Sequence, residues 1–269
     1  MFFEHRGNRF HYRWDGRGEP LTLVHGVGGQ LDAWDLVVPI LAPEFRILRY
    51  DLRGHDRSDK VRGPYALADF VDDLAGLLDH AGLASTNLVG FSLGGLVVQA
   101  FALAHPSRVK KLVIMSAIAG RNEDERTKVQ GRLQALAERG GVSHYEASLG
   151  RWFTDEFRKA HPEEIERRRR HAEEMDPACY LAAYTVLATS DLGDELHKIR
   201  NETFIVTGEN DIGSNPRMAR LMHERIANSR LHIIPRLKHN LVLEAPDLVG
   251  ALLRGFLAGG APEATRRSV

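Results

Sequence analysis

A single serine, Ser92, lies among glycines and apolar residues in the stretch LVGFSLGGLVVQA (88–100). Residues 90–94 fit the pattern G-x-S-x-G, between a run typical of a strand and a run typical of a helix. A sharp strand-to-helix turn needs small residues on both sides of the serine, because larger ones would clash. The hydroxyl then projects at a helix N-terminus, where backbone N–H groups favour a developing negative charge. The pattern predicts that Ser92 is a nucleophile.

A serine hydroxyl is a weak nucleophile, so it needs a base, and the base needs an acid that orients it. Where this turn carries catalysis, the order along the chain is serine, acid, histidine. His239 follows the last apolar run and Asp211 follows the run before it. We therefore predict His239 as the base and Asp211 as the acid. His232, inside the last run, and His223, on the preceding helical stretch, are weaker choices of base.

Three other carboxylates compete with Asp211 for the role of the acid. Glu209 and Asp191 are weaker rivals. Some proteins of this topology take the acid from the end of an earlier strand, which would favour Asp124. Asp124 lies in a charged run well beyond that strand, so Asp211 is preferred.

A negative charge that develops on the substrate needs two N–H donors. One is expected from Leu93, directly after the serine. The second is expected from Val27, because the glycines of HGVGGQ (25–30) allow the main chain to turn its N–H inward. A dinucleotide site is not predicted here, because the loop lacks G-x-G-x-x-G.

Six short apolar runs, each bounded by turn residues, are typical of buried strands. Because they are apolar on both faces, they predict a parallel sheet covered by helices. Helical patterns over 65–83 and 95–106 alternate with them, which favours an open, doubly wound sheet. Two further strands are expected around the turn at Gly7–Asn8, at one edge of the sheet. The six runs are LTLVHG (21–26), FRILRYD (45–51), NLVGFS (87–92), KLVIMSA (111–117), TFIVTGE (203–209) and RLHIIP (230–235).

The interval 120–198 differs from the rest, because it is rich in charge, has helical texture and carries no strong strand signal. We interpret it as a helical insertion that covers the sheet. The predicted organisation is a core of residues 1–119 and 199–260, a helical cap of residues 120–198 and a flexible tail of residues 261–269.

The composition argues against several classes of protein. The 269 residues include 36 basic and 36 acidic side chains, so no basic excess indicates a nucleic-acid partner. No apolar run approaches the ~20 residues that span a bilayer, and charges interrupt the N-terminal MFFEHRGNRF, so no membrane association is expected. The single cysteine, Cys179, fits a cytoplasmic location, and no spacing of cysteine and histidine indicates a metal site.

Five segments, HGVGG, YDLRGHDRSD, GFSLGG, GENDIGSNP and KHNLVLEAP, together resemble the α/β-hydrolase superfamily, in the expected order along residues 10–258. The interval GRWFTDEFRKAHPE, with DPACYLAAYTVLATSDLGDELHKI, resembles the helical cap of 3-oxoadipate enol-lactonases and their relatives. This resemblance implies the α/β-hydrolase fold and a small, carboxylate-bearing ester or lactone as substrate. It also suggests that Trp152 lines the pocket, with packing inside the cap as the equal alternative.

Two positions depart from the family pattern. Asp56 stands where the loop G-H-G-x-S has glycine, and Lys238 precedes the base where many relatives have glycine. Lys238 is expected on the solvated surface, with a contact to a substrate acid as the alternative. The arginines 167–170 are expected to form ion pairs with neighbouring glutamates, and Cys179 to be a small buried residue.

These observations predict a cofactor-free serine hydrolase that cleaves a small carboxylic ester or lactone through an acyl-enzyme. A C–C bond hydrolase of meta-cleavage diketo acids and a haloperoxidase-like perhydrolase would use the same parts. A haloalkane dehalogenase is disfavoured, because Ser92 stands where that chemistry needs a carboxylate. A ligand-binding receptor stays open as a non-enzymatic alternative, since fold alone does not determine function. A homo-oligomer also stays open.

Overall fold

A mixed sheet of eight strands forms the centre of the computed structural model, which describes residues 1–259. The strand order is β1-β2-β4-β3-β5-β6-β7-β8. The pairs from β4 to β8 are parallel, whereas β1 and β2 form antiparallel pairs at one edge, as expected for the strands around Gly7–Asn8. The strands are β1 (Phe2–His5), β2 (Asn8–Gly16), β3 (Glu19–Val24), β4 (Phe45–Tyr50), β5 (Thr86–Phe91), β6 (Val109–Met115), β7 (Glu202–Gly208) and β8 (Ser229–Ile234).

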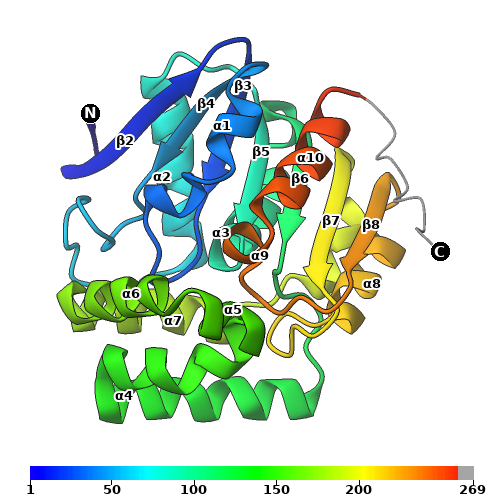
Figure 1. The fold of residues 1–269 in the computed structure, drawn as a ribbon. Coiled ribbons are helices and arrows are strands. Elements are labelled where there is room, and N and C mark those ends of the chain that lie inside the picture. Colours follow the sequence, from blue (N-terminus) through cyan, green and yellow to red (C-terminus); the bar gives the residue numbers. More distant parts are fainter. Residues whose placement is uncertain (260–269) are drawn as a thin grey trace.

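The central strands are buried on both faces, and alternate residues enter different cores. In β6, Leu112 and Ile114 join one hydrophobic cluster, whereas Val113 and Met115 join the other. Successive side chains of a strand point to opposite faces, so a run that is apolar throughout needs cover on both sides. The predicted parallel sheet with helices on both faces is confirmed (Figure 1).

Two sets of helices supply this cover (Figure 1). The cluster that holds Leu112 also contains buried residues of α2, α3 and α8, and the cluster that holds Val113 contains buried residues of α1, α9 and α10. The core helices are α1 (Val38–Leu41), α2 (Leu67–His80), α3 (Leu93–Ala104), α8 (Pro216–Arg225), α9 (Leu241–Glu244) and α10 (Pro246–Leu257), with short 3₁₀ helices η1 (Leu31–Trp34) and η2 (Pro106–Arg108).

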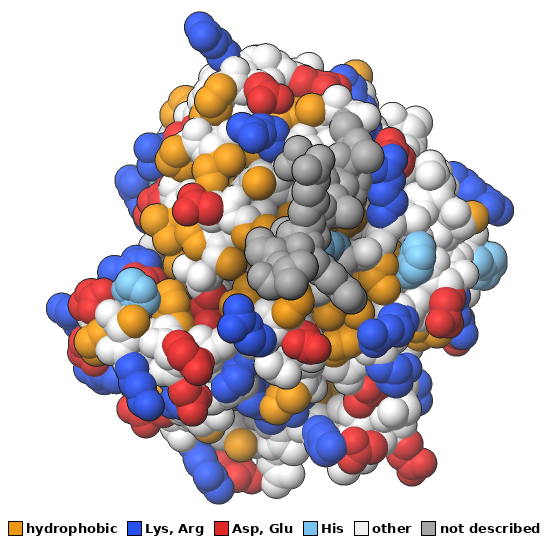
Figure 2. Space-filling model, turned by 45° about the vertical axis from the view of Figure 1, so that its right-hand side comes forward, with side chains coloured by type: hydrophobic (Ala, Val, Ile, Leu, Met, Phe, Trp, Pro, Cys, Tyr) orange, Lys and Arg blue, Asp and Glu red, His pale blue; other side chains and the backbone are white. Residues whose placement is uncertain are grey.

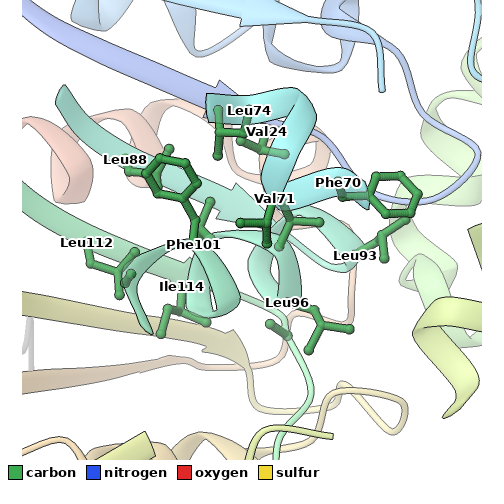
Figure 3. Packing of buried hydrophobic residues seen from close by; sticks show 14 of the residues in the cluster. Val24, Phe70, Val71, Leu74, Leu88, Leu93, Leu96, Phe101, Leu112 and Ile114 are labelled. Atoms are coloured by element: carbon green, nitrogen blue, oxygen red, sulfur yellow. The ribbon is translucent and has the colours of Figure 1, made fainter. Parts of the chain in front are cut away.

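Helix α3 is apolar on almost every side because it is enclosed between the sheet and α2. Figure 3 shows Leu93, Leu96 and Phe101 of α3 among side chains of β5, β6 and α2. All three are fully shielded from solvent. Burying side chains of this size stabilises the fold by about 1.5–3 kcal/mol each. This packing fixes the N-terminus of α3, where Ser92 lies.

Between β6 and β7 the chain forms only helices and connecting loops. This segment contains α4 (Glu123–Trp152), which is interrupted at Gly140 by a left-handed residue with φ of 80°. In Figure 1 the green helices lie together across one end of the sheet. We call residues 120–198 the cap; the predicted boundaries of core and cap remain a proposal, and the predicted tail 261–269 lies outside the described residues. The other cap elements are α5 (Asp155–Ala160), α6 (Pro162–Glu174), α7 (Pro177–Thr189) and the 3₁₀ helix η3 (Gly193–Lys198).

The surface carries charges of both signs. On the face drawn in Figure 2, basic and acidic side chains lie interspersed over core and cap. Within residues 1–259, no helix combines the length and the apolar character that crossing a bilayer requires.

Candidate active site

The register of the parallel strands brings three chain segments together at one edge of the sheet. Gly90 of β5 pairs with Val24 of β3, and Met115 of β6 pairs with Val206 of β7. The carboxyl ends of these strands therefore lie side by side, which is where open α/β sheets place their ligands. Ser92 follows β5, Asp211 follows β7 and His239 follows β8.

Ser92 occupies a strained turn between β5 and α3. Its backbone has φ of 56° and ψ of −115°, a conformation that residues with a side chain rarely adopt. The residues two positions before and after Ser92 must be glycine. A Cβ on Gly90 would lie 2.2 Å from the Gly94 carbonyl oxygen, and a Cβ on Gly94 would lie 2.1 Å from the Val24 oxygen. The sequence pattern G-x-S-x-G is thus a steric requirement of this turn.

Ser92, His239 and Asp211 form a continuous hydrogen-bonded chain. The Nε2 atom of His239 lies 3.1 Å from the Ser92 Oγ, and its Nδ1 lies 2.7 Å from the Asp211 Oδ2. The other Asp211 oxygen, Oδ1, accepts the N–H groups of Gly213 and Ser214, each at 2.9 Å. This arrangement suits transfer of the serine proton to the imidazole.

Asp211 is ionised although it is almost fully buried. Burial alone would raise the pKa of its carboxyl, but the neighbouring His239 and the hydrogen bonds to Oδ1 and Oδ2 outweigh burial and lower the pKa below its usual value. A permanently charged carboxylate fixes the imidazole orientation and favours its protonated form.

The loop of His239 is tied to both the core and the cap. The Ser116 hydroxyl donates to the His239 carbonyl at 3.1 Å, and the Asn240 N–H donates to the Trp152 carbonyl at 3.0 Å. Lys238 donates to the Gly150 carbonyl at 2.7 Å, at the end of α4. Lys238 therefore neither extends freely into solvent nor lines the cavity; it joins the loop of His239 to the cap.

Val27 and Leu93 were predicted to supply the N–H groups of an oxyanion site, and both N–H groups lack an acceptor within the described residues. Leu93 is the first residue of α3, so its N–H has no acceptor within the helix. Among the described residues 1–259, neither N–H donates a hydrogen bond. Gly28, next to Val27, has φ of 70°, a conformation that glycine adopts without strain.

Two buried histidines hold this loop in place, and the sequence analysis gave neither a role. The Nδ1 of His25 lies 2.8 Å from the Gly26 carbonyl, while its Nε2 accepts the Leu52 N–H at 3.0 Å. His55 accepts the Gly28 N–H at 3.1 Å through Nε2. Each acceptor nitrogen must be unprotonated. His25 begins the glycine-rich segment HGVGGQ, whereas His55 lies within the charged segment YDLRGHDRSD, and no signal in the sequence marks its contact with Gly28.

The environment keeps both histidines neutral. Burial lowers the pKa of His55 to about 4 and that of His25 well below its usual value. Neighbouring positive charge adds to this effect, from His55 on His25 and from Lys60 on His55. At neutral pH they can therefore accept the two backbone hydrogen bonds. Protonation would remove both acceptors.

A cavity of about 110 Å³ opens above Ser92, between the core and the cap. Val27, Ser92 and His239 line its core side, and Trp152 and Tyr180 are among the residues that line its cap side. Trp152 thus faces the cavity, as the resemblance suggests. A further feature was not expected from the sequence: the cap side also carries cationic side chains, namely Arg121, Arg132, Arg151 and Arg168.

The rival carboxylates have other partners. Glu209 accepts the Arg236 N–H at 2.8 Å in a turn, and Asp124 pairs with Lys128 at 2.6 Å on the surface of α4. Asp191 accepts the N–H groups of Gly120 and Arg121 at 2.6 and 2.8 Å, where the cap begins.

The other histidines considered as bases also lie apart from Ser92. His232 lies within β8, and His223 on α8 contacts Ser229 at 2.9 Å. Neither is among the residues that line the cavity.

The remaining predictions from the sequence fit the structure with one addition. Cys179 is buried, as expected. The arginines 167–170 form ion pairs with glutamates of α6, also as expected. Arg168, however, additionally faces the cavity while it pairs with Glu164 at 2.8 Å.

Asp56 has φ of 36°, so the residue that replaces glycine is held in a left-handed conformation. It lies beside His11 and Asp51, and the ligand-type atoms of these three lie within 4.8 Å of one another. Among residues 1–259 this is the one cluster with metal-ligand composition. His11 and Asp51 already bind each other at 2.7 Å, and Asp51 also accepts the Leu31 N–H, so their hydrogen bonds explain the cluster without an ion.

Several known hydrolases are similar to this chain. The chain is 28% identical over 250 residues to (E)-2-((N-methylformamido)methylene)succinate hydrolase of Acinetobacter baylyi, which covers 92% of this chain and 93% of that protein. It is 30% identical to 2-hydroxy-6-oxo-2,4-heptadienoate hydrolase of Pseudomonas putida, over 90% of each chain. The crystal structure of the enol-lactonase from Burkholderia xenovorans LB400 superimposes with a TM-score of 0.90 at 27% identity, covering 96% of this chain and 100% of the other.

A family model described as alpha/beta hydrolase fold matches residues 19–246, from the start of β3 to the start of α10. The match includes Ser92, Asp211 and His239 and the whole of the cap. The chain belongs to the alpha/beta hydrolase fold family.

Proposed function

We propose that this protein is a serine hydrolase that cleaves a small carboxylic ester or lactone. The observation that carries the proposal is the chain of hydrogen bonds from Ser92 through His239 to Asp211, at a strained turn that opens into a cavity. The likeness to an enol-lactonase structure and to proteins named hydrolases supports the same chemistry.

The proposed reaction has two steps. In the first, the Ser92 oxygen bonds to the carbonyl carbon while His239 takes the hydroxyl proton. The ester C–O bond then breaks, and His239 returns the proton to the leaving oxygen, which leaves an acyl group on Ser92. In the second, His239 takes a proton from water, the hydroxide attacks the acyl carbon, and Ser92 is released with its proton restored.

The proposed oxyanion site acts in both steps. The N–H groups of Val27 and Leu93 stabilise the oxygen that becomes negative in each tetrahedral intermediate. His25 and His55 position the loop that carries the first of these groups. Because the loop is held before substrate binds, little reorganisation is needed when charge develops.

Cleavage of a C–C bond in a diketo acid is the second candidate, favoured by the relative named 2-hydroxy-6-oxo-2,4-heptadienoate hydrolase. A panel of 4-nitrophenyl esters, lactones and a 2-hydroxy-6-oxo-dienoic acid would separate the two. We expect turnover of esters and lactones with a burst of nitrophenol that matches the enzyme concentration. Turnover of the dienoic acid alone would replace the proposal with the second candidate. Stoichiometric binding without turnover of any compound would favour a receptor.

A further inference from the structure

The end of β6 contacts the segments that carry all three residues of the proposed triad. The Met115 carbonyl accepts the Ser92 N–H at 2.9 Å. The Ser116 N–H, directly after the strand, donates at 2.8 Å to the Val206 carbonyl of β7, the strand that precedes the acid. The Ser116 hydroxyl donates to the His239 carbonyl at 3.1 Å. Two adjacent residues therefore join the nucleophile, the strand of the acid and the base.

Ser116 is held in a left-handed backbone conformation, with φ of 43°. Among residues 1–259, five residues with a side chain have a positive φ, and only Ser92 and Ser116 of these five are buried. A Cβ disfavours this conformation, whereas glycine adopts it without strain. Strain of this kind persists where the surrounding structure requires it, often at functional sites. A serine where glycine would be unstrained therefore indicates that its hydroxyl is used.

The Ser116 hydroxyl lies outside the cavity above Ser92. Ser116 is only 1% exposed and is not among the residues that line this cavity. The partner of its hydroxyl, the His239 carbonyl, also accepts the Leu241 N–H at 3.0 Å, but that contact lies within the loop of the base. Ser116 therefore supplies the hydrogen bond that ties the main chain of His239 to the sheet.

The position of His239 must be exact because its imidazole contacts two partners at once. Its Nε2 lies 3.1 Å from the Ser92 Oγ, and its Nδ1 lies 2.7 Å from the Asp211 Oδ2. Proton transfer needs heavy atoms about 2.6–3.2 Å apart, so the contact with Ser92 is close to the upper limit. A misplacement of about 1 Å can lower a rate about a hundredfold. A fixed main chain keeps both contacts within range.

We propose that Ser116 is a positioning residue, whose hydroxyl fixes the main chain of His239 so that the imidazole reaches Ser92 and Asp211 together. The inference rests on the proposed function and adds Ser116 to the residues on which the rate depends. Because Ser116 acts through His239 and does not line the cavity, its loss should lower kcat and leave KM nearly unchanged.

The first test measures the kinetics of three variants on a 4-nitrophenyl ester. In Ser116→Ala and in Ser116→Gly, which both lack the hydroxyl, we expect kcat to fall about tenfold to a hundredfold, with KM changed less than about threefold. Ser116→Thr keeps a hydroxyl and should retain kcat within about threefold of wild type. Wild-type kcat in the first two variants, or a loss in Ser116→Thr equal to that in Ser116→Ala, would overturn the proposal.

Thermal midpoints of the same variants separate positioning from a general loss of stability. Glycine relieves the strain at this φ, so Ser116→Gly should unfold at a higher temperature than Ser116→Ala. Threonine is β-branched and increases the strain, so Ser116→Thr should unfold at the lowest temperature of the three. The proposal predicts that kcat is nevertheless highest in Ser116→Thr. If kcat follows the midpoint instead, Ser116 has only a structural role.

Thr203→Val is the matched control. Thr203 is buried at the opposite end of β7, and its hydroxyl donates to the Asn201 carbonyl at 2.8 Å. The variant removes a buried hydrogen bond of the same kind at the edge of the sheet away from the triad. It should lower the midpoint while kcat stays within about threefold of wild type. A fall in kcat equal to that of Ser116→Ala would overturn the specific role of Ser116.

The second test does not depend on turnover. Proton NMR follows the Nδ1–H of His239, which Asp211 shields from exchange with water, with His239→Gln to assign the signal. We expect this proton to exchange at least about tenfold faster in Ser116→Ala and Ser116→Gly than in wild type. If wild type hydrolyses no ester but this difference is found, the proposed function fails and the positioning role stands. Absence of the signal in wild type, or equal exchange in all three proteins, would overturn the positioning role whatever the esterase activity.

Discussion

The two sides of the cavity differ in how their imidazole nitrogens are satisfied. On the core side, the imidazoles of His239, His25 and His55 each contact partners through both ring nitrogens. On the cap side, Arg132 and His144 carry buried nitrogen atoms without partners. Imidazoles whose two ring nitrogens both have partners are held in one orientation, whereas a nitrogen without a partner leaves a side chain less firmly fixed. The comparison suggests that the core side carries out chemistry and the cap side recognises substrate.

The largest expected effect is on the core side. Ser92→Ala and His239→Ala should each lower kcat about 10⁴–10⁶-fold, because the nucleophile and its base act as a unit. Asp211→Asn should cost about 10⁴-fold, since the amide no longer stabilises the correct imidazole tautomer. Steady-state kinetics with a 4-nitrophenyl ester measures all three.

The comparison also requires that these three variants remain folded, with wild-type circular dichroism. A folded core-side variant that retains kcat within tenfold of wild type would show that the core side does not carry out the chemistry.

Packing beneath the serine turn should give the next largest effect. Phe101 of α3 is fully buried between β5, β6 and α2. Phe101→Ala should lower the free energy of unfolding by about 3–5 kcal/mol, because it leaves a cavity under the helix that positions Ser92. Urea denaturation followed by circular dichroism measures the change. If the free energy of unfolding fell by less than about 1 kcal/mol, the packing beneath Ser92 would not be tight enough to hold the core side in one geometry.

Acid should weaken both sides of the cavity through their neutral histidines. Burial lowers the pKa of His55, and likewise that of His144, from 6.5 to about 4. The unfolded chain therefore takes up protons at a higher pH than the folded protein does. The contribution of each histidine is complete above pH 6.5 and is lost as the pH falls toward 4, by about 3 kcal/mol for His55.

Denaturation midpoints at pH 8, 6, 5 and 4 would measure this loss. His55→Gln and His144→Gln should each flatten the acid limb of the curve, the first on the core side and the second on the cap side. A free energy of unfolding that stays constant between pH 7 and 4.5 would contradict the assignment of neutral, buried imidazoles.

The smallest expected effect concerns the loop that carries Asp56. Its φ of 36° is costly for any residue with a side chain. Asp56→Gly should raise the free energy of unfolding by about 0.5–1 kcal/mol. Asp56→Ala serves as the control, because it removes the charge but keeps the strain. If Ala stabilises as much as Gly, the charge beside Asp51 and not the backbone is responsible.

Much of the fold follows from local patterns, because apolar runs and glycine-rich turns act over a few residues. The strands after which Ser92, Asp211 and His239 appear are predicted within a few residues, and chain order alone favours these three positions. The helix predicted from residue 95 begins at Leu93, because a helix start depends on the geometry of the turn before it.

The contacts made across the chain could not be predicted in the same way. His55 reaches Gly28 from a different loop, and Lys238 reaches the cap, so both depend on tertiary packing. The sequence also does not show that Arg132 and Arg151 line the same cavity, for another reason. Gly140 interrupts α4 between them, which resets the helical phase, so spacing does not show that they share a face.

The central claim is that Ser92 is a nucleophile activated by His239. Treatment with a fluorophosphonate probe, followed by peptide mass spectrometry, tests it directly in wild type and His239→Ala. The account predicts one adduct, on Ser92, that forms readily in wild type and at least about a hundredfold more slowly in the variant. No adduct on Ser92 in folded wild-type protein, or equal labelling in the two proteins, would contradict it.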